Sequence, residues 1–258
     1  MTVPSEFVFR KFGANSAVST TFVPVAEGGV YRTPQVGGAA QLRVRAGNAD
    51  DTAAGDGARK VTLSGLNAAG EYIEEEIETN GASAGALSSN AFLRLFRGYV
   101  SESGTYADQD SGSHVADIVI ETAGGVDWMT ITSTNFPHGQ SLIGAYSVPL
   151  GYVARIRDIV LCVDSTKSAT LALFRRGNIL DTAAPYSAMR VQATFQGVSG
   201  VRVIKPQEYN DEDNETFAEY DQLTDFGFMA RVAVTSAAVS VDFGVQLINR
   251  LAIEKYRV

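Results

Sequence analysis

Residues 237–250 read AAVSVDFGVQLINR, and an apolar side chain recurs there at every second position. Alternation with a period of two is typical of a β-strand that buries one face and exposes the other. The predicted buried face carries Val239, Val241, Phe243, Val245 and Leu247, and the predicted exposed face carries Ser240, Asp242, Gly244 and Gln246. This stretch therefore predicts a half-buried strand.

Five further segments repeat the same alternation, at residues 114–121, 152–165, 189–195, 200–206 and 226–236. They are short, rich in Val, Thr, Phe and Tyr, and separated by Gly, Asn, Asp and Ser, a composition typical of strands joined by turns. The sequence predicts a mainly β protein with two antiparallel β-sandwich or jelly-roll-like modules.

Helical signals are few. Residues 214–223 favour one short helix, because Thr216 precedes Glu219 by the spacing of a capping box. Residues 88–100 read SSNAFLRLFRGYV and fit either period, with the strand pattern slightly favoured.

A β-hairpin is predicted within residues 50–81, which read DDTAAGDGARKVTLSGLNAAGEYIEEEIETNG. The turn-forming residues LNAAGE separate two alternating segments, so we expect a connection of about 4–5 residues. Glu74, Glu76 and Glu78 then project from one side of the second strand, and Lys60 offsets part of their charge from the first. The glycines at either end mark turns and require no ligand.

Composition divides the chain into three parts. Residues 1–30 are predicted to form an extended N-terminal arm, residues 31–138 a first β-rich domain, and residues 139–258 a second β-sandwich domain, with a turn near the boundary. The arm carries three aromatic side chains with little local sequence to pack against, Phe7, Phe9 and Phe12.

The chain is acidic, with a net charge of −8, and 45% of its residues are hydrophobic. This composition predicts a folded protein and disfavours binding to nucleic acid or to an anionic membrane. Its single cysteine, Cys162, excludes an internal disulfide and lies in an apolar context that predicts burial. We find no apolar stretch typical of a signal peptide or membrane span, and so expect synthesis in the cytoplasm without a cleaved leader.

The best metal candidate is calcium near Asp211–Glu215, where Asp211, Asp213 and Glu215 alternate as an EF-hand loop begins. The sixth and twelfth positions of that loop require Gly and Glu, but Thr216 and Gln222 stand there, so the motif fails. A solvated acidic loop is the favoured interpretation, and an irregular calcium site stays open.

Signals for catalysis and cofactors are weak. No phosphate-binding loop and no strand–GxGxxG–helix unit is present. His138 lies near Ser141, but no nucleophile elbow surrounds that serine, and two histidines with one cysteine make a poor zinc set. We therefore predict no catalytic residues, no cofactor and no enzyme activity. Trp128 and the many carboxylates keep a glycan site open as a lesser alternative.

The candidate partner-contact residues are the three aromatics of the arm and a basic pair. Arg175 and Arg176 stand together in LFRRGN, the clearest basic pair in an acidic chain. They fit either a contact with an acidic partner or a solvated hairpin tip.

Four motifs occur in a fixed order: DTAAGDGAR at residues 51–59, VTLSGL at 61–66, NG at 80–81 and YSVPLGY at 146–152. Together they resemble a group of tailed-bacteriophage virion structural proteins, over about residues 18–160. The resemblance implies a non-enzymatic, β-rich part of a phage particle and supplies no catalytic residues.

On this resemblance, the leading hypothesis is a capsid decoration, or cement, protein on the outer surface of the virion. Such a protein would bind the major capsid protein and stabilise the shell by favouring its assembled state, and a homotrimer would suit local three-fold positions. The first alternative is a head-fibre, neck or tail protein, structural or in contact with the host. A glycan-binding or glycan-cleaving protein is a less favoured one.

Overall fold

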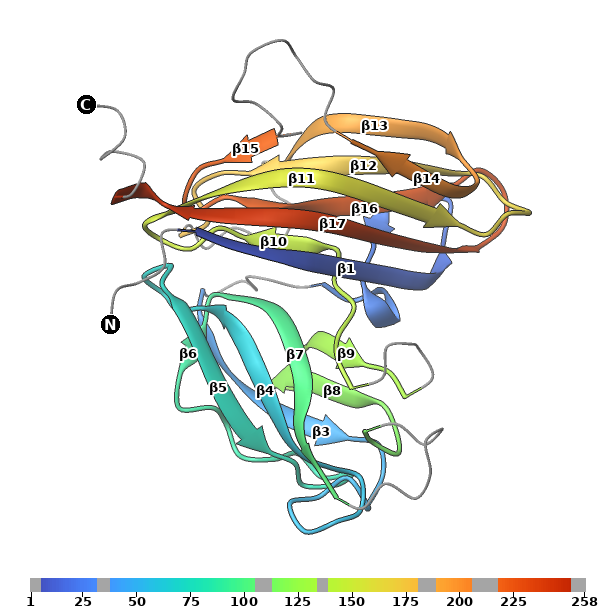
Figure 1. Cartoon of the computed structure of the whole chain (residues 1–258). Helices are drawn as coiled ribbons and strands as arrows, with labels where there is room; N and C mark the ends of the chain where they lie inside the picture. Colours follow the sequence, from blue (N-terminus) through green and yellow to red (C-terminus); the bar gives the residue numbers. More distant parts are fainter. Residues whose placement is uncertain are drawn as a thin grey trace. The chain divides into compact units, whose positions relative to one another are not determined.

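The computed structural model describes residues 6–31, 38–104, 113–133, 139–180, 189–205 and 218–251. In these ranges the named elements are β-strands numbered β1 to β17 and one 3-10 turn, Glu27–Gly29 (Figure 1). The predicted mainly β fold is confirmed. None of the described elements is a helix with the length and hydropathy needed to cross a membrane.

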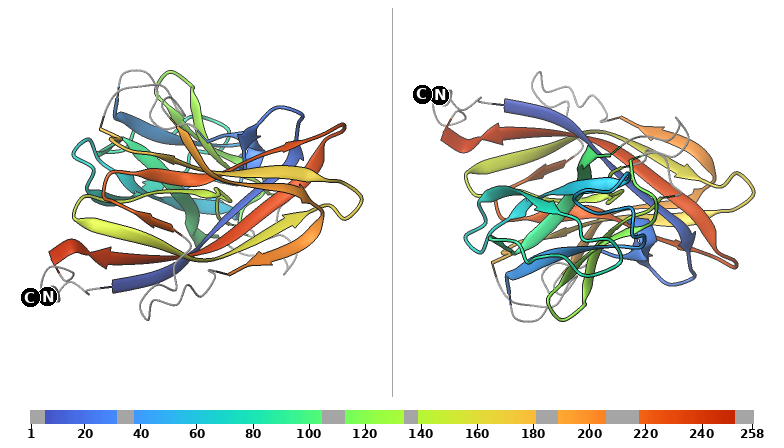
Figure 2. Two further views of the ribbon diagram at one scale, coloured as in Figure 1. Left: turned by 90° about the horizontal axis from the view of Figure 1, so that it is seen from above. Right: turned by 90° about the horizontal axis from the view of Figure 1, so that it is seen from below.

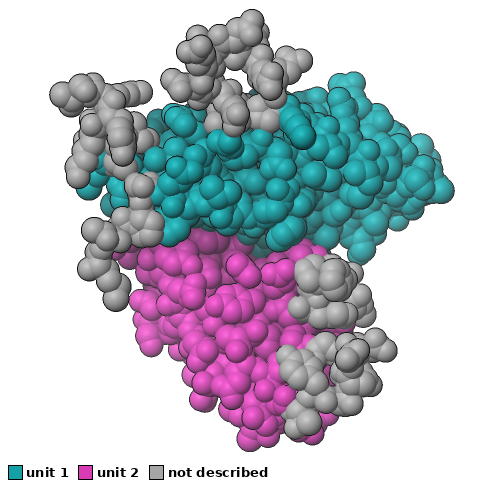
Figure 3. Space-filling model, viewed as in Figure 1, with its two compact units in different colours: residues 1–29, 143–179, 188–258 teal, residues 30–142, 180–187 magenta. Residues whose placement is uncertain are grey.

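The chain divides into two compact units, coloured separately in Figure 3. Unit 1 comprises Met1–Gly29, Ile143–Ile179 and Ala188–Val258, and unit 2 comprises Val30–Leu142 and Leu180–Ser187. The first expected domain, residues 31–138, thus lies within unit 2, and most of the second, residues 139–258, lies within unit 1. Of residues 1–30, expected as a separate arm, residues 1–29 belong to unit 1.

Unit 1 contains two antiparallel sheets. The β1–β14 sheet has the order β1 (Glu6–Val18), β17 (Ala237–Asn249), β11 (Tyr152–Val163), β14 (Gly200–Ile204), and β15 (Ala218–Tyr220) also pairs with β11. The β10–β13 sheet has the order β10 (Ala145–Ser147), β16 (Asp225–Val232), β12 (Ala169–Arg176), β13 (Arg190–Val198), and β2 (Val23–Pro24) also pairs with β16.

Aromatic side chains join the two sheets of unit 1. The ring of Phe243 on β17 lies 6.1 Å from that of Phe226 and 5.4 Å from that of Phe228, both on β16. Tyr220 of β15 stacks on Phe226 at 4.1 Å. Residues 214–217 of the expected short helix lie outside the described residues, and in its described part Ala218–Tyr220 is a strand, from which Tyr220 packs into this core. The alternation predicted for residues 237–250 is confirmed, with Phe243 fully buried.

Much of the predicted N-terminal arm is a strand. Residues 6–18 form β1, which pairs antiparallel with β17 from Glu6 opposite Ile248 to Val18 opposite Ala237. Figure 2 shows β1 in blue directly beside β17 in red. The arm is corrected to an edge strand, because the backbone partner of each of its residues lies more than 200 positions later in the chain.

Unit 2 also contains two antiparallel sheets. One has the order β6 (Ala91–Phe92), β3 (Ala40–Ala46), β8 (Ile118–Thr122), β9 (Asp127–Ile131), and the other, the β5–β7 sheet, has the order β5 (Tyr72–Glu78), β4 (Ala58–Leu66), β7 (Arg94–Ser103). The sheets pack closely, since a Cβ added to Gly98 of β7 would lie 2.9 Å from the sulfur of Met129 on β9. Trp128, Leu63 and Ile120 are fully buried in this unit.

The predicted hairpin is confirmed. β4 and β5 pair from Lys60 opposite Glu78 to Leu66 opposite Tyr72, with residues 67–71 between them. The Nζ atom of Lys60 lies 3.2 Å from a carboxylate oxygen of Glu76, as the cross-strand charge pattern predicted.

Asp51 gives the motif at residues 51–59 a structural role. Its side chain is fully buried and accepts hydrogen bonds from the backbone N–H groups of Ala58 (2.9 Å), Val115 (2.9 Å) and Ala116 (3.1 Å). A Cβ at Gly57 would collide with this carboxylate. The aspartate and the glycine therefore secure a turn of unit 2, and no bound ligand is needed to explain them.

Candidate partner-binding surface

The outward side of the β1–β14 sheet forms one continuous surface, which we call the β1–β14 face. Cross-strand pairing places its residues in rows, because directly paired residues project from the same side of a sheet. One row runs Phe12, Asp242, Val160, Val203, and the next runs Ala14, Ser240, Cys162, Val201. Cys162, expected to be buried, is half-buried on this face.

Apolar side chains stand exposed at both edges of the face. On β1, Val8 is 68% exposed and Phe12 is 41% exposed, and on β14, Val201 is 67% and Val203 is 58% exposed. Between them lie mostly polar side chains of β17 and β11, among them Asp242, Gln246 and Arg155. Exposed aliphatic and aromatic side chains gathered on one rigid surface are typical of a protein-binding site.

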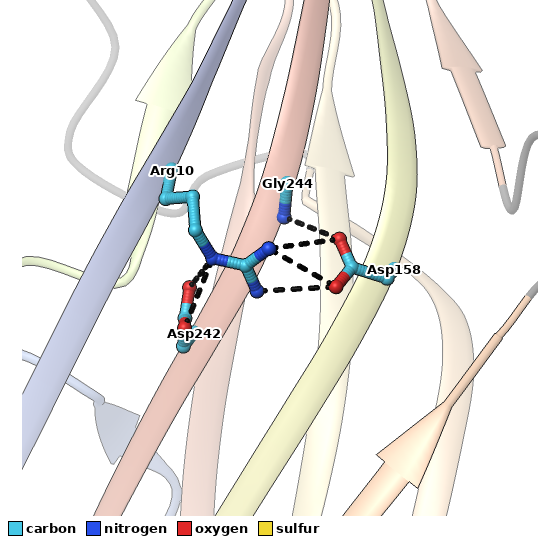
Figure 4. Close-up of polar contacts among 4 residues, drawn as sticks. All are labelled: Arg10, Asp158, Asp242 and Gly244. Carbon is cyan, nitrogen blue, oxygen red and sulfur yellow. Dashed lines mark hydrogen bonds and ion pairs between the residues drawn. The ribbon is translucent and has the colours of Figure 1, made fainter.

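A charged network crosses the face between these edges (Figure 4). The Nε atom of Arg10 on β1 donates to Asp242 Oδ1 on β17 at 2.8 Å. Its Nη1 and Nη2 atoms both donate to Asp158 Oδ2 on β11, each at 3.1 Å. One guanidinium therefore bridges three strands and fixes the edge strand β1 to the sheet.

A β-bulge brings Asp158 onto this side of the sheet. The register between β11 and β17 shifts between Ile156 and Asp158, so that Ile156 pairs with Val245 and Asp158 with Gly244. The extra residue turns the Asp158 carboxylate outward, where it accepts the Gly244 N–H at 3.2 Å. Any Cβ at Gly244 would collide with that carboxylate.

The Arg10 guanidinium keeps its charge at ordinary pH values. The hydrogen bond with Asp242 raises the pKa of Arg10 above its ordinary value, and the bond with Asp158 adds to the effect. Because the three side chains are already paired with one another, they present a fixed charge pattern to a partner. Such a pattern can orient an approaching protein surface by its charge. The polar groups of the network themselves bond to one another and so stabilise the sheet.

The three aromatic candidates separate onto the two sides of β1. Phe12 lies on the β1–β14 face. Phe9 points to the sandwich interior, where its ring lies 5.1 Å from that of Tyr146 on β10. Phe7 shares the side of Phe9 at the end of the strand, 6.5 Å from the ring of Tyr152. Only Phe12 therefore belongs to the candidate surface, because successive side chains of a strand project to opposite sides.

The basic pair is also separated. Arg175 is exposed near the end of β12, whereas Arg176 is only 2% exposed. Arg176 lies 3.9 Å from Asp225, whose carboxylate accepts a 2.6 Å hydrogen bond from Ser147. Arg176 is corrected from a partner contact to a buried residue of the β10–β13 sheet, because a buried guanidinium requires an acidic partner within the fold.

The other candidate residues from the sequence lie in different environments. Trp128 is fully buried, so it offers no platform to a sugar. Ser141 accepts the Gly98 N–H at 3.0 Å, and His114 is buried beside Ser113. His138 and the calcium candidate at Asp211–Glu215 lie outside the described residues. Within the described ranges, no group of three or more His, Cys, Asp or Glu side chains could hold a metal ion.

Val8, Val201 and Val203 were not predicted as surface residues. The segment of Val201 and Val203 alternates as a half-buried strand does, so its apolar positions were assigned to the interior, whereas Val8 falls in residues 1–30, which were predicted as an extended arm. Both β1 and β14 are edge strands of their sheet. Nothing in the local sequence distinguishes an exposed valine on an edge strand from a buried one on a central strand.

Comparison with known proteins yields only distant structural likenesses. The sequence matches no protein-family model and no curated protein. A structure titled "Structure of infectious bursal disease virus Gt strain" aligns over 96% of this chain and 74% of that chain, at 9% identity and a TM-score of 0.25. Infectious bursal virus derived T=1 particles align over 96% and 79%, at 8% identity and a TM-score of 0.16. At such scores neither likeness carries an argument about this chain.

Proposed function

We propose that this protein is a non-enzymatic structural component of a virus particle, and that its β1–β14 face binds a neighbouring protein of the shell. The observation that carries the proposal is the pair of apolar edges on that face, at Val8 and Phe12 and at Val201 and Val203. The resemblance of residues 51–59 and 146–152 to phage virion proteins supports the assignment to a particle.

The finer form of the proposal is a decoration protein on the outer surface of a tailed-phage capsid. There it would bind the major capsid protein, and three copies would meet at a local three-fold position. Burying the apolar edges against two neighbouring capsomers would favour the assembled shell by mass action. A rigid sandwich suits this role, because little conformational entropy is lost when it docks.

The test introduces a charge into one apolar edge. We expect Val8→Asp to reduce binding to the particle by about tenfold or more, because the carboxylate would be buried without a partner. The matched control is Val234→Asp, since Val234 is 80% exposed in the turn before β17 and lies off the face. Both variants are first checked for wild-type thermal unfolding, and their incorporation into particles is then measured by quantitative mass spectrometry.

Two results would overturn the proposal. The first is equal incorporation of the two variants. The second is a particle that lacks this protein and yet keeps its full resistance to heat.

Copy number separates the decoration protein from the alternative of a head-fibre, neck or tail protein. A shell protein occurs in hundreds of copies per particle, whereas neck and fibre proteins occur in tens or fewer. Counting copies in purified particles decides between them, and electron microscopy of the same particles locates the protein.

One observation favours a glycan-binding function as a second candidate. On the outer side of the β5–β7 sheet, Tyr72 is half exposed and donates a 2.6 Å hydrogen bond to Glu74. On β7, the Arg97 guanidinium lies over the ring of Tyr99, 4.9 Å from its centroid. Aromatic rings with adjacent polar groups are suited to sugars. Glycan arrays with the wild type and Tyr72→Ala test this candidate, and absence of binding by the wild type removes it.

A further inference from the structure

Several strands in the described part of the chain are hydrogen-bonded on one side only, among them β1, β13, β14 and β5. β14 is hydrogen-bonded on one side, to β11, and β5 is hydrogen-bonded on one side, to β4. The opposite edge of the β5–β7 sheet is covered, because residues 139–141 exchange backbone hydrogen bonds with Gly98 and Val100 of β7. An open edge presents a row of backbone donors and acceptors to which another strand can add.

The open edges of β14 and β5 carry opposite charges. Arg202 on β14 and Lys205 just beyond it are exposed. On β5, the exposed carboxylates are those of Glu74, Glu76 and Glu78. Like charges placed directly opposite each other destabilise a strand pair, so β14 repels a second β14 and β5 repels a second β5. A pair of β14 with β5 is the combination in which the charges attract.

The side-chain alternation of the two strands allows their charged residues to meet. A register that places Arg202 beside the carboxylates of Glu74 and Glu76 puts Val201 and Val203 on the opposite side of the new pair. That side of β5 carries Ile73, Glu75 and Ile77, of which Ile77 is buried. The same register therefore joins charge to opposite charge on one side, and on the other it places one valine against Ile73 or Ile77 and the other valine against Glu75.

We propose that β14 of one copy of this chain pairs with β5 of a second copy. The contact is heterologous, since different surfaces of the two copies meet, and it repeats from copy to copy until a ring closes or a filament continues. A closed ring of three would be one such product. This inference rests on the strand edges and does not depend on the virus-particle proposal, which concerns the β1–β14 face.

Charge exchange tests the pairing. The oligomeric state of the full chain is measured by sedimentation velocity for the wild type, Arg202→Glu, the double variant Glu74→Lys with Glu76→Lys, and a variant that combines all three changes. We expect each of the first two variants to weaken association by about tenfold or more, because like charges then face each other. The combined variant restores opposite charges and should recover the association of the wild type to within about threefold.

The control variant is Arg231→Glu. Arg231 is exposed on β16, which has paired strands on both sides, so the same change of charge lies away from an open edge. It should leave association unchanged. Thermal unfolding confirms that each variant is folded before its association is compared.

Hydrogen exchange supplies a second measurement on the unaltered protein. As concentration rises, the amides of β5 and β14 should gain protection, because free edge groups become hydrogen-bonded in the contact. The proposal is overturned by a wild type that stays monomeric at about 0.1 mM, by single-edge variants that associate as the wild type does, or by a folded combined variant that fails to recover.

Val8→Asp separates this inference from the virus-particle proposal. We expect it to weaken binding to the particle and to leave self-association unchanged. Self-association that depends on Val8 would contradict the pairing of β14 with β5.

Discussion

Glu121 lies on β8 beside two arginines of the neighbouring strand β3. Its carboxylate is 2.7 Å from the Nη2 atom of Arg43 and 3.1 Å from the Nε atom of Arg45. Burial disfavours the charged form, but the hydrogen bonds from the two arginines outweigh burial and hold the pKa of Glu121 below its ordinary value. The ionised carboxylate therefore stabilises unit 2.

Glu121→Gln should lower the free energy of unfolding of unit 2 by about 1–3 kcal/mol at pH 7, since one partner of a buried, charge-assisted contact is removed. Because the folded pKa lies below the unfolded one, the contribution of Glu121 is present above the unfolded pKa of about 4.3 and disappears as pH falls through the folded value. The difference between variant and wild type should shrink over that acidic range.

Urea unfolding followed by tryptophan fluorescence measures this difference for unit 2, because the single tryptophan, Trp128, lies in its core. Glu78→Gln, at an exposed carboxylate of the same unit, is the control and should change stability by less than about 0.5 kcal/mol. A difference that stays constant into strong acid would contradict the assignment.

At the scale of elements, β1 depends on close backbone packing. Gly13 faces the sandwich interior, and a Cβ there would collide with the backbone of Gly144 and with the carbonyl oxygen of Val25. The neighbouring segment cannot yield easily, because the Gly144 N–H donates to that same carbonyl at 2.9 Å. The absence of a side chain at position 13 is therefore a requirement of unit 1.

Gly13→Ala should destabilise unit 1 by about 3 kcal/mol, since the strand must move away from residues that are fixed by hydrogen bonds. Gly177→Ala is the matched control, because a Cβ at that position of unit 1 would meet no atom within 4 Å. It should change stability by less than about 1 kcal/mol. Far-ultraviolet circular dichroism during thermal unfolding compares the two variants, and equal midpoints would refute the packing argument.

Local patterns predicted the local elements well. The hairpin of β4 and β5 was predicted with its turn and with the contact of Lys60 to the acidic strand, because its two strands are neighbours in sequence. β1 was not predicted as a strand, because its partner β17 is supplied by residues 237–249. The sequence near either strand does not indicate a partner that lies so far along the chain. Alternation within one strand shows only which of its residues share a side.

The candidate surface was predicted only in part for the same reason. Phe12 was identified as an aromatic side chain without local partners, which is a genuine signal of contact elsewhere. The same argument included Phe9, whose partner Tyr146 is distant in sequence. Arg176 was interpreted as a surface charge because Asp225, its buried partner, is also far along the chain.

At the scale of the whole molecule, each unit has its own buried core, with Phe243 in unit 1 and Trp128 in unit 2. Domains with separate cores unfold as separate cooperative bodies. We therefore expect two transitions by differential scanning calorimetry.

Phe243→Ala should destabilise unit 1 by about 3–5 kcal/mol and lower the midpoint temperature of the unit 1 transition alone. Trp128→Ala should destabilise unit 2 by a similar amount and lower the midpoint of the unit 2 transition alone. Tryptophan fluorescence of the wild type identifies the transition of unit 2. A single transition that shifts equally with either substitution would show that the two units unfold together.

Because β1 pairs with β17, it cannot take its place in the sheet until most of the chain has been synthesised. The described strands of unit 2 have all been synthesised by residue 131 and the last segment of that unit by residue 187, so unit 2 can fold while the chain is still growing. β1 emerges earlier but must wait for residues 237–249, a delay of about 10–50 s at ordinary rates of translation. During that interval a nascent strand with exposed Val8 and Phe12 lacks its hydrogen-bonding neighbour, and a chaperone that shields it would raise the yield of folded protein.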